Sequence, residues 1–163
     1  MALTQITGSG IGQVTDIKIG GSGSANTLND YEEGEYEVTA TPSAGGSITL
    51  NGGFNSASYT KIGRLVHVCG LLGVSSVSSP SGYISLNLPF TPANLSDRAG
   101  DSVASVYITG SVSNFVRDYV ASVNESDANI FIQLGDGTNA VNDSANQMQA
   151  NSNIVFSISY HTA

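Results

Sequence analysis

The chain is short of charge, and above all of positive charge. Only 11% of its 163 residues are charged, with five Lys and Arg against 13 Asp and Glu, so the net charge is -8. Binding to nucleic acid or to an anionic membrane surface needs clustered basic residues. The sequence also lacks the run of about 20 apolar residues that spans a bilayer. We therefore expect neither a nucleic-acid partner nor membrane insertion.

Cysteine is equally scarce. Cys69 is the only cysteine, which excludes an intrachain disulfide, and it lies in the apolar run 65–74, where we expect a small buried hydrophobe. Residues 1–6 have neither the basic region nor the apolar run of a signal peptide. The glycine-rich stretch 8–12 lacks the third glycine of a dinucleotide fingerprint. No cofactor is expected.

The residues that are plentiful favour strands. Val, Ile, Thr and Tyr suit a pleated sheet, whereas the helix-favouring Glu, Lys and Arg are few. No segment holds a convincing 3.6-residue apolar period. The alternating pattern predicts about eight short strands within 36–40, 47–50, 59–75, 83–88, 102–110, 116–123, 129–134 and 153–160. The predicted fold class is all-β: an antiparallel β-sandwich or jelly-roll-like head.

Two features of the strand pattern carry sharper expectations. Asn51-Gly52 is typical of a tight hairpin with positive backbone angles. Residues 59–75 read as one long strand, or as two joined by a kink at Gly70 or Gly73. Both faces of the stretch 65–74 are apolar, which predicts a central strand covered on each side. One of the covering layers is expected from a neighbouring subunit.

The first 29 residues differ from the rest. Glycines punctuate residues 1–29, which predicts an extended Gly/Ser-rich arm, with the head formed by residues 30–163. Such an arm is ordered only when something holds it, either neighbouring subunits or its own head. At the boundary, five carboxylates crowd into residues 30–37. They are read as a solvated edge that discourages aggregation or, alternatively, as a cation site.

Nothing in the sequence requires catalysis. His67 and Cys69 share a strand face, as a nucleophile and its base would, but a buried, hydrogen-bonded histidine is the favoured interpretation. His161 is expected to be exposed. Asp118 with Glu125 or Asp127 is too dispersed to be backed as a glycosidase pair. We expect the protein not to be an enzyme and to bind no resident metal.

Ligand contacts are sought among loop-borne aromatic and polar groups. Tyr83 flanks a Ser/Gly/Pro turn, and Tyr119 neighbours Arg117, so each is a candidate for contact with a sugar or protein receptor. Asp136 and Asn139 sit in a loop rich in oxygen ligands, for which a simple turn is the favoured interpretation and a surface cation site the alternative. These five residues are the predicted contact set.

Two phrases, Asp30-Tyr31-Glu32-Glu33-Gly34-Glu35-Tyr36 and Tyr59-Thr60-Lys61-Ile62-Gly63-Arg64-Leu65-Val66, stand out from this background. Together with the apolar-Pro-Phe phrase at 88–90, they resemble the head domains at the C-terminal ends of bacteriophage tail-fibre and other virion-surface proteins. The chain departs from the resemblance after Gly34, where that family often continues with a tryptophan and this sequence has Tyr36 among further acids.

The resemblance implies a function as well as a fold. Such heads are usually homotrimers on the virion surface that attach to a glycan or protein receptor on the host. An alternative is a capsid-decorating or neck-fibre subunit that docks on other virion proteins through residues 1–29. A further alternative is a free carbohydrate-binding β-sandwich module. We expect a stable trimer in solution for a virion fibre and a monomer for the free module.

Overall fold

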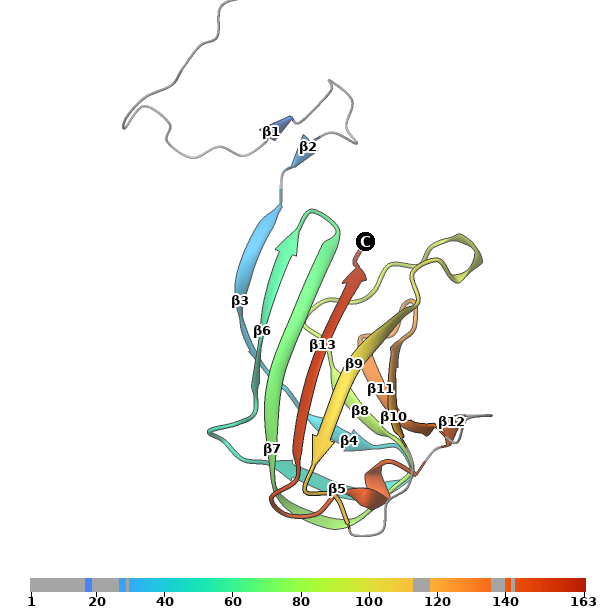
Figure 1. Ribbon diagram of the computed structural model, residues 1–163. Coiled ribbons are helices and arrows are strands. Elements are labelled where there is room, and N and C mark those ends of the chain that lie inside the picture. Colours follow the sequence, from blue (N-terminus) through green and yellow to red (C-terminus); the bar gives the residue numbers. More distant parts are fainter. Residues whose placement is uncertain (1–16, 19–26, 29, 113–117, 136–139, 142) are drawn as a thin grey trace, which may run out of the picture.

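A computed structural model describes residues 17–18, 27–28, 30–112, 118–135, 140–141 and 143–163. These residues contain antiparallel strands and short 3-10 turns but no α-helix (Figure 1). The strands are β1 (Ile17–Lys18), β2 (Thr27–Leu28), β3 (Tyr31–Glu37), β4 (Ala40–Pro42), β5 (Gly45–Leu50), β6 (Ser56–Ile62), β7 (Leu65–Ser81), β8 (Ile84–Asn87), β9 (Ser102–Thr109), β10 (Asp118–Val123), β11 (Asn129–Gly135), β12 (Ala140–Val141) and β13 (Asn153–His161); the 3-10 turns are η2 (Ser96–Arg98) and η3 (Ala145–Gln147).

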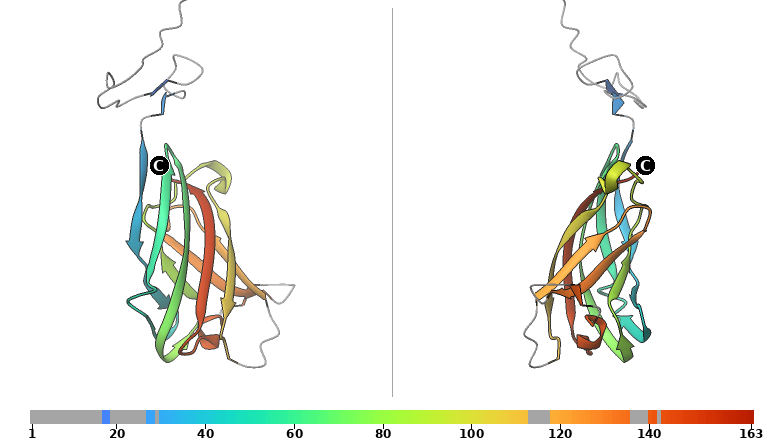
Figure 2. Two further views of the ribbon diagram at one scale, coloured as in Figure 1. Left: turned by 60° about the vertical axis from the view of Figure 1, so that its left-hand side comes forward. Right: turned by 90° about the vertical axis from the view of Figure 1, so that its right-hand side faces the viewer.

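One continuous sheet curls over to form two layers. Its strand order is β3-β6-β7-β13-β9-β10-β11-β8-β4, and every pairing is antiparallel. We call β3, β6, β7, β13 and β9 the front layer, and β10, β11, β8 and β4 the back layer (Figures 1 and 2). Strand β9 turns the corner, since residues 105–109 pair with β13 and residues 102–104 with β10. The predicted all-β antiparallel fold is confirmed.

The core lies between the two layers and follows from alternation along each strand. In β13 every second residue is buried, from Ile154 to Tyr160, and β11 buries Ile130, Ile132 and Leu134 in the same way. Such strict period-two burial is what a strand with one covered face produces. The alternate residues of these strands face away from the core.

The stretch 59–75 is not one strand. The chain reverses at Gly63-Arg64, so β6 and β7 form a hairpin in which Ile62 pairs with Leu65. Gly63 has φ +58, a backbone angle that two-residue hairpin loops require and that glycine adopts without strain. Strand β7 then runs through Gly70 and Gly73 to Ser81 without ending at either glycine. The break expected at those glycines was therefore placed wrongly.

Asn51-Gly52 does not close a hairpin either. The flanking strands β5 and β6 both pair with β7, along different halves of it, and not with each other. The Asn51 side chain accepts a hydrogen bond from the Gly53 N–H at 3.0 Å, and the Asn51 carbonyl accepts one from the Phe54 N–H at 2.7 Å, so residues 51–54 form a turn without positive φ at Gly52. The dipeptide lies in a turn, but the strands on either side of it, β5 and β6, pair with β7 and not with each other.

Strand β7 is central, but the described part of the chain covers only one of its faces. Val66, Val68, Leu72 and Val74 are buried, whereas Leu65 and Leu71 on the other face are each 45% exposed. Cys69, expected to be buried, is half-buried on that outer face. The chain's own residues thus supply one covering layer, and the second layer, expected from a neighbouring subunit, stays a prediction.

The acidic phrase forms the edge of the sheet. Among the described residues, strand β3 pairs only with β6, and the exposed Glu33, Glu35 and Glu37 line the outer face of this edge strand. This arrangement matches the interpretation as a solvated edge, since charge on an edge strand discourages pairing with another sheet.

The head has two distinct ends. At the N-terminal end, Gly63 donates a backbone hydrogen bond to Asp30, and Thr162 donates one to Arg64, so the start of β3 and the end of β13 flank the β6–β7 turn on either side (Figure 1). At the far end, the β4–β5 turn, the chain before β8 and η3 come together through Ser43–Tyr83 and Ala145–Gly82 backbone hydrogen bonds. Strands β1 and β2 pair with each other within the predicted arm.

Candidate functional site

Three of the five predicted contact residues, Arg117, Asp136 and Asn139, lie outside the described residues. The other two face opposite sides of the back layer. Tyr83 continues the outward row of β8, since Ile84 and Leu86 are buried, whereas Tyr119 shares the inward row of β10 with buried Ala121 and Val123. The structure does not bring these two tyrosines together.

Tyr83 belongs to an outward aromatic pair. Its ring meets Phe131 of β11 edge-on, with 5.5 Å between the ring centroids, and both side chains remain half-buried. Its backbone N–H donates to the Ser43 hydroxyl at 2.9 Å, which ties this residue to the β4–β5 turn at the far end. An aromatic pair beside polar side chains can contact a ligand, and Tyr83 stays a prediction for that role.

Tyr119 has a packing role. Its side chain is half-buried and packs against the hydrophobic core. Burial raises the pKa of the Tyr119 phenol, and a hydrogen bond with Ser111 acts in the opposite direction. The sequence pattern could have suggested this placement, because Tyr119 alternates in step with Ala121 and Val123.

The histidines and the cysteine lie on the outer face of the front layer. His67 is exposed and not buried as expected, because none of the residues that the structure describes covers this side of β7. Its Nδ1 lies 3.0 Å from the Ser159 hydroxyl, while Cys69 Sγ lies 3.5 Å from the Ser58 hydroxyl. The two side chains therefore have separate partners across neighbouring strands. His161 is exposed, as predicted.

The carboxylates of the acidic strand are spread over separate partners. Tyr59 donates to Glu32 at 2.6 Å, Asn55 donates to Glu37 at 2.9 Å, and Tyr31 donates to Glu33. Among the described residues, no group of three or more His, Cys, Asp or Glu side chains is arranged to hold a metal ion. The arrangement of these carboxylates therefore does not support the alternative interpretation as a cation site.

The three phrases that carry the family resemblance meet in one corner of the head. Strands β3 and β6 pair directly, so that Gly34 lies opposite Tyr59 and Glu32 opposite Lys61. Lys61 forms an ion pair with Asp30, and its Nζ lies 5.5 Å from the centre of the Phe90 ring. We call these six residues, Asp30, Glu32, Gly34, Tyr59, Lys61 and Phe90, the β3–β6 corner.

Aromatic packing explains why the corner needs these residue types. The Tyr59 ring contacts Phe90 edge-on at 5.2 Å and Tyr36 at 6.4 Å between centroids. A Cβ atom at Gly34 would lie 3.0 Å from the Tyr59 hydroxyl oxygen, so glycine makes room for the ring. The hydrogen bond to Glu32 raises the pKa of Tyr59. The residues of the β3–β6 corner therefore have a packing role at this edge of the head.

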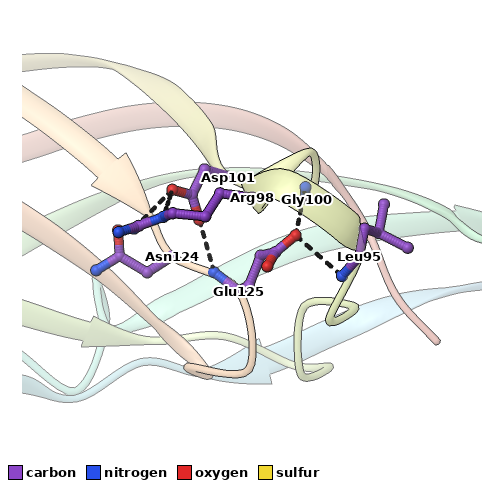
Figure 3. A network of polar contacts seen from close by, with 6 residues as sticks. All are labelled: Leu95, Arg98, Gly100, Asp101, Asn124 and Glu125. Carbon is purple, nitrogen blue, oxygen red and sulfur yellow. Dashed lines mark hydrogen bonds and ion pairs between the residues drawn. The ribbon is translucent and has the colours of Figure 1, made fainter.

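A second polar network, which the sequence did not reveal, fixes a loop at the N-terminal end (Figure 3). One carboxylate oxygen of Glu125 accepts hydrogen bonds from the backbone N–H of Leu95 at 3.0 Å and of Gly100 at 2.7 Å. The Glu125 N–H in turn donates to Asp101 at 2.9 Å, and Arg98 pairs with the same carboxylate at 2.7 Å. The hydrogen bond from the Glu125 N–H is the main cause that lowers the pKa of Asp101, and the hydrogen bond from Arg98 lowers it further.

The clamped loop presents charged side chains to solvent. Asp97 and Arg98 both have positive φ, at 56° and 60°, which costs energy for residues with a side chain and persists only where surrounding contacts hold it. The Arg98 side chain is 70% exposed. Asp118 lies at the opposite end of β10 from Glu125, so the structure does not assemble the glycosidase pair that the sequence raised.

The fold of this chain resembles that of part of a known protein. No protein-family model matches the chain, and no curated protein matches it. The solved structures include a match to the crystal structure of the Dettilon tailspike protein, with a TM-score of 0.67 and 20% sequence identity. The match covers 80% of this chain but only 23% of the tailspike chain. The head therefore shares the fold of one part of a tailspike.

The described residues include no helix that is long and apolar enough to cross a membrane.

Proposed function

We propose that this chain is a structural protein of a bacteriophage virion, the head of a tail fibre or tailspike that attaches to a receptor on the host. The observation that carries the proposal is the fold likeness to a tailspike over 80% of the chain. The meeting of the three resemblance phrases at the β3–β6 corner supports it, since residues far apart in the sequence build one local unit. The proposal assigns no catalytic step.

The two ends of the head have different tasks in this proposal. Residues 1–29 precede Asp30 at the N-terminal end and attach the head to the other virion proteins. The far end then points away from the particle. Tyr83, paired with Phe131, lies there together with the β4–β5 turn, and it is the described residue that we assign to receptor contact. Loops on a rigid sheet scaffold are the usual carriers of recognition.

The head is proposed to act as a homotrimer. A fibre that must hold a receptor on a cell surface gains avidity when several heads bind at once. The exposed apolar side chains of the front layer are consistent with burial against further copies of the chain.

Immunogold labelling of intact particles tests the proposed role. Antibodies raised against the purified protein are applied to virions of the phage that encodes it. Label at the tail is the expected result. Label on the capsid or neck would support the alternative of a decorating subunit docked by residues 1–29. Particles without label would overturn the virion role and leave a free carbohydrate-binding module as the interpretation to pursue.

A further inference from the structure

Exposed apolar side chains gather on one face of the head. Of the nine large hydrophobic side chains exposed among the described residues, eight lie on the front layer's outer side and one, Val120, on the back layer. The eight are Tyr31, Phe54, Ile62, Leu65, Leu71, Val103, Tyr107 and Val155. Since the two layers have similar strand numbers, this asymmetry points to a partner for the front layer.

The strand register joins four of these side chains into a continuous band. Leu71 pairs with Val155, and Val155 pairs with Tyr107, so the three side chains form a row across β7, β13 and β9. Phe54 lies over Gly73, next to Leu71 on the same face of β7, because a Cβ at Gly73 would be 3.3 Å from the Phe54 Cβ. We call Phe54, Leu71, Val155 and Tyr107 the apolar band.

The surroundings of the band carry no formal charge from Asp, Glu, Lys or Arg. The outward residues of β6, β7, β13 and β9 contain none of these residue types, although the chain has a net charge of -8. The exposed glutamates of β3 lie along one border of the face, and beyond β9 the outward row of β10 begins with the exposed Asp118. Two copies of an acidic chain repel each other through most surfaces, whereas an uncharged face brings no like charges together.

Polar groups beside the band already have partners within the face. The His67 ring nitrogen lies 3.0 Å from the Ser159 hydroxyl, and the Ser58 hydroxyl donates to the Cys69 carbonyl at 3.3 Å. Covering such groups costs less than covering polar groups whose hydrogen bonds all go to water. The face can therefore be buried without leaving these side chains unpaired.

The size of the face suits a stable contact. Four strands spaced about 4.8 Å apart, each about 30 Å long for the nine residues of β13, give a flat area of roughly 600 Å². Side-chain relief adds to this figure, and a standard interface buries about 800 Å² on each partner.

From these observations we infer that the outer face of the front layer, centred on the apolar band, is the surface through which copies of this chain bind one another. The inference rests on the assembly proposed above and adds the surface that forms it. The partner is a second copy because the face carries an exposed apolar band and no Asp, Glu, Lys or Arg, and is large enough for a contact, in a chain whose net charge is -8.

The test compares two charge insertions of matched exposure. Leu71 on the front layer is 45% exposed and Val120 on the back layer is 42% exposed. Light scattering over a concentration series measures the molar mass of the full chain and of the Leu71→Glu and Val120→Glu variants. We expect the native chain and Val120→Glu to form oligomers of the 16.7 kDa chain, and Leu71→Glu to be a monomer. Circular dichroism checks that each variant is folded.

Three results would overturn the inference: a monomeric native chain, a Leu71→Glu oligomer like the native one, or equal dissociation of both variants. Should Leu71→Glu fail to fold, Tyr107→Ser decides instead, because it removes a 67% exposed ring without adding charge. The outcome is independent of the virion role. Gold label at the tail with a monomeric native chain would reject the proposed assembly and this surface but leave the virion role standing, whereas an oligomer without label on particles would reject the virion role alone.

Discussion

At the scale of single residues, Gly70 is a packing requirement. A Cβ atom at this position would lie 2.9 Å from the Ala57 Cβ and 3.4 Å from the Phe156 ring. Because the neighbouring strand cannot retreat easily, we expect Gly70→Ala to lower the free energy of unfolding by about 1–3 kcal/mol, as overpacked cores do. Urea denaturation measures this value.

Gly52→Ala is the matched control for that substitution. Nothing lies within 4 Å of a Cβ built at Gly52, and the residue has no positive φ. Alanine there should leave the free energy of unfolding unchanged or raise it by less than about 1 kcal/mol, through the unfolded chain's lost freedom. Equal effects of the two substitutions would contradict the packing argument.

The buried tyrosines provide a second residue-scale prediction. Burial raises the pKa of Tyr160, whose hydroxyl donates to the Phe90 carbonyl at 2.9 Å, to about 12, and raises the pKa of Tyr36 further. A raised pKa means that the folded state favours the neutral phenol. The resulting stability is fully present below the unfolded pKa of about 10 and is lost as the pH rises through 12.

Absorbance at 295 nm follows the phenolates that form. We expect the folded protein to show an incomplete change at pH 11, and the guanidinium-unfolded chain to complete its change with a midpoint near 10. Tyr160→Phe serves as the control and should remove part of the late change. A folded protein whose tyrosines all titrate together near pH 10 would refute the assignment.

At the scale of elements, Glu125 holds the loop after Pro92 against the β10–β11 connection. Glu125→Ala leaves the Leu95 and Gly100 N–H groups without their acceptor, so we expect a loss of about 1–3 kcal/mol in unfolding free energy. Glu125→Gln keeps an acceptor oxygen and should lose less. Amide hydrogen exchange is the sharper measurement, and it should quicken at Leu95 and Gly100 in Glu125→Ala. Unchanged exchange there would show that the clamp does not hold the loop.

The elements also show how far the sequence could be read. Alternation identified β9, β11 and β13 to within a few residues, because each of these strands has one covered face. The pattern failed at Gly63, since the residues around that turn continue the apolar alternation of the strands on either side. It failed again at Asn51-Gly52, where pairing of β5 and β6 with β7 overrides the local turn preference.

The binding surfaces were harder to predict than the strands. Tyr83 and Tyr119 look alike in sequence, and only the layer geometry places one outward and the other inward. The Glu125 clamp joins a side chain to backbone groups 25 and 30 residues away, and such pairs leave no local pattern. The two resemblance phrases contain cross-strand partners 27 to 31 residues apart in the sequence, from Glu32–Tyr59 to Asp30–Lys61, and the resemblance alone did not predict this pairing.

At the scale of the whole molecule, two routes to assembly make different demands on the chain. If the outer face of the front layer joins the copies, the head alone suffices. If instead residues 1–29 of several copies wind together and hold the assembly, the head alone is a monomer. The buried hydrophobic residues of the described part of the chain lie between Val38 and Tyr160, and Asp30 makes the contacts to Gly63 and Lys61 that secure the start of β3. A fragment of residues 30–163 therefore retains what the head needs to fold.

We expect the thermal unfolding transition of the 30–163 fragment in calorimetry to lie within a few degrees of that of the full chain. The reason is that the fragment keeps the buried hydrophobic residues described above. We also expect it to keep the oligomeric mass of the full chain in light scattering. A folded but monomeric fragment would assign assembly to residues 1–29 and contradict the surface inferred here. Adding Leu71→Glu to the fragment provides the control, because a front-face contact should then be lost while the thermal transition stays close to that of the unsubstituted fragment.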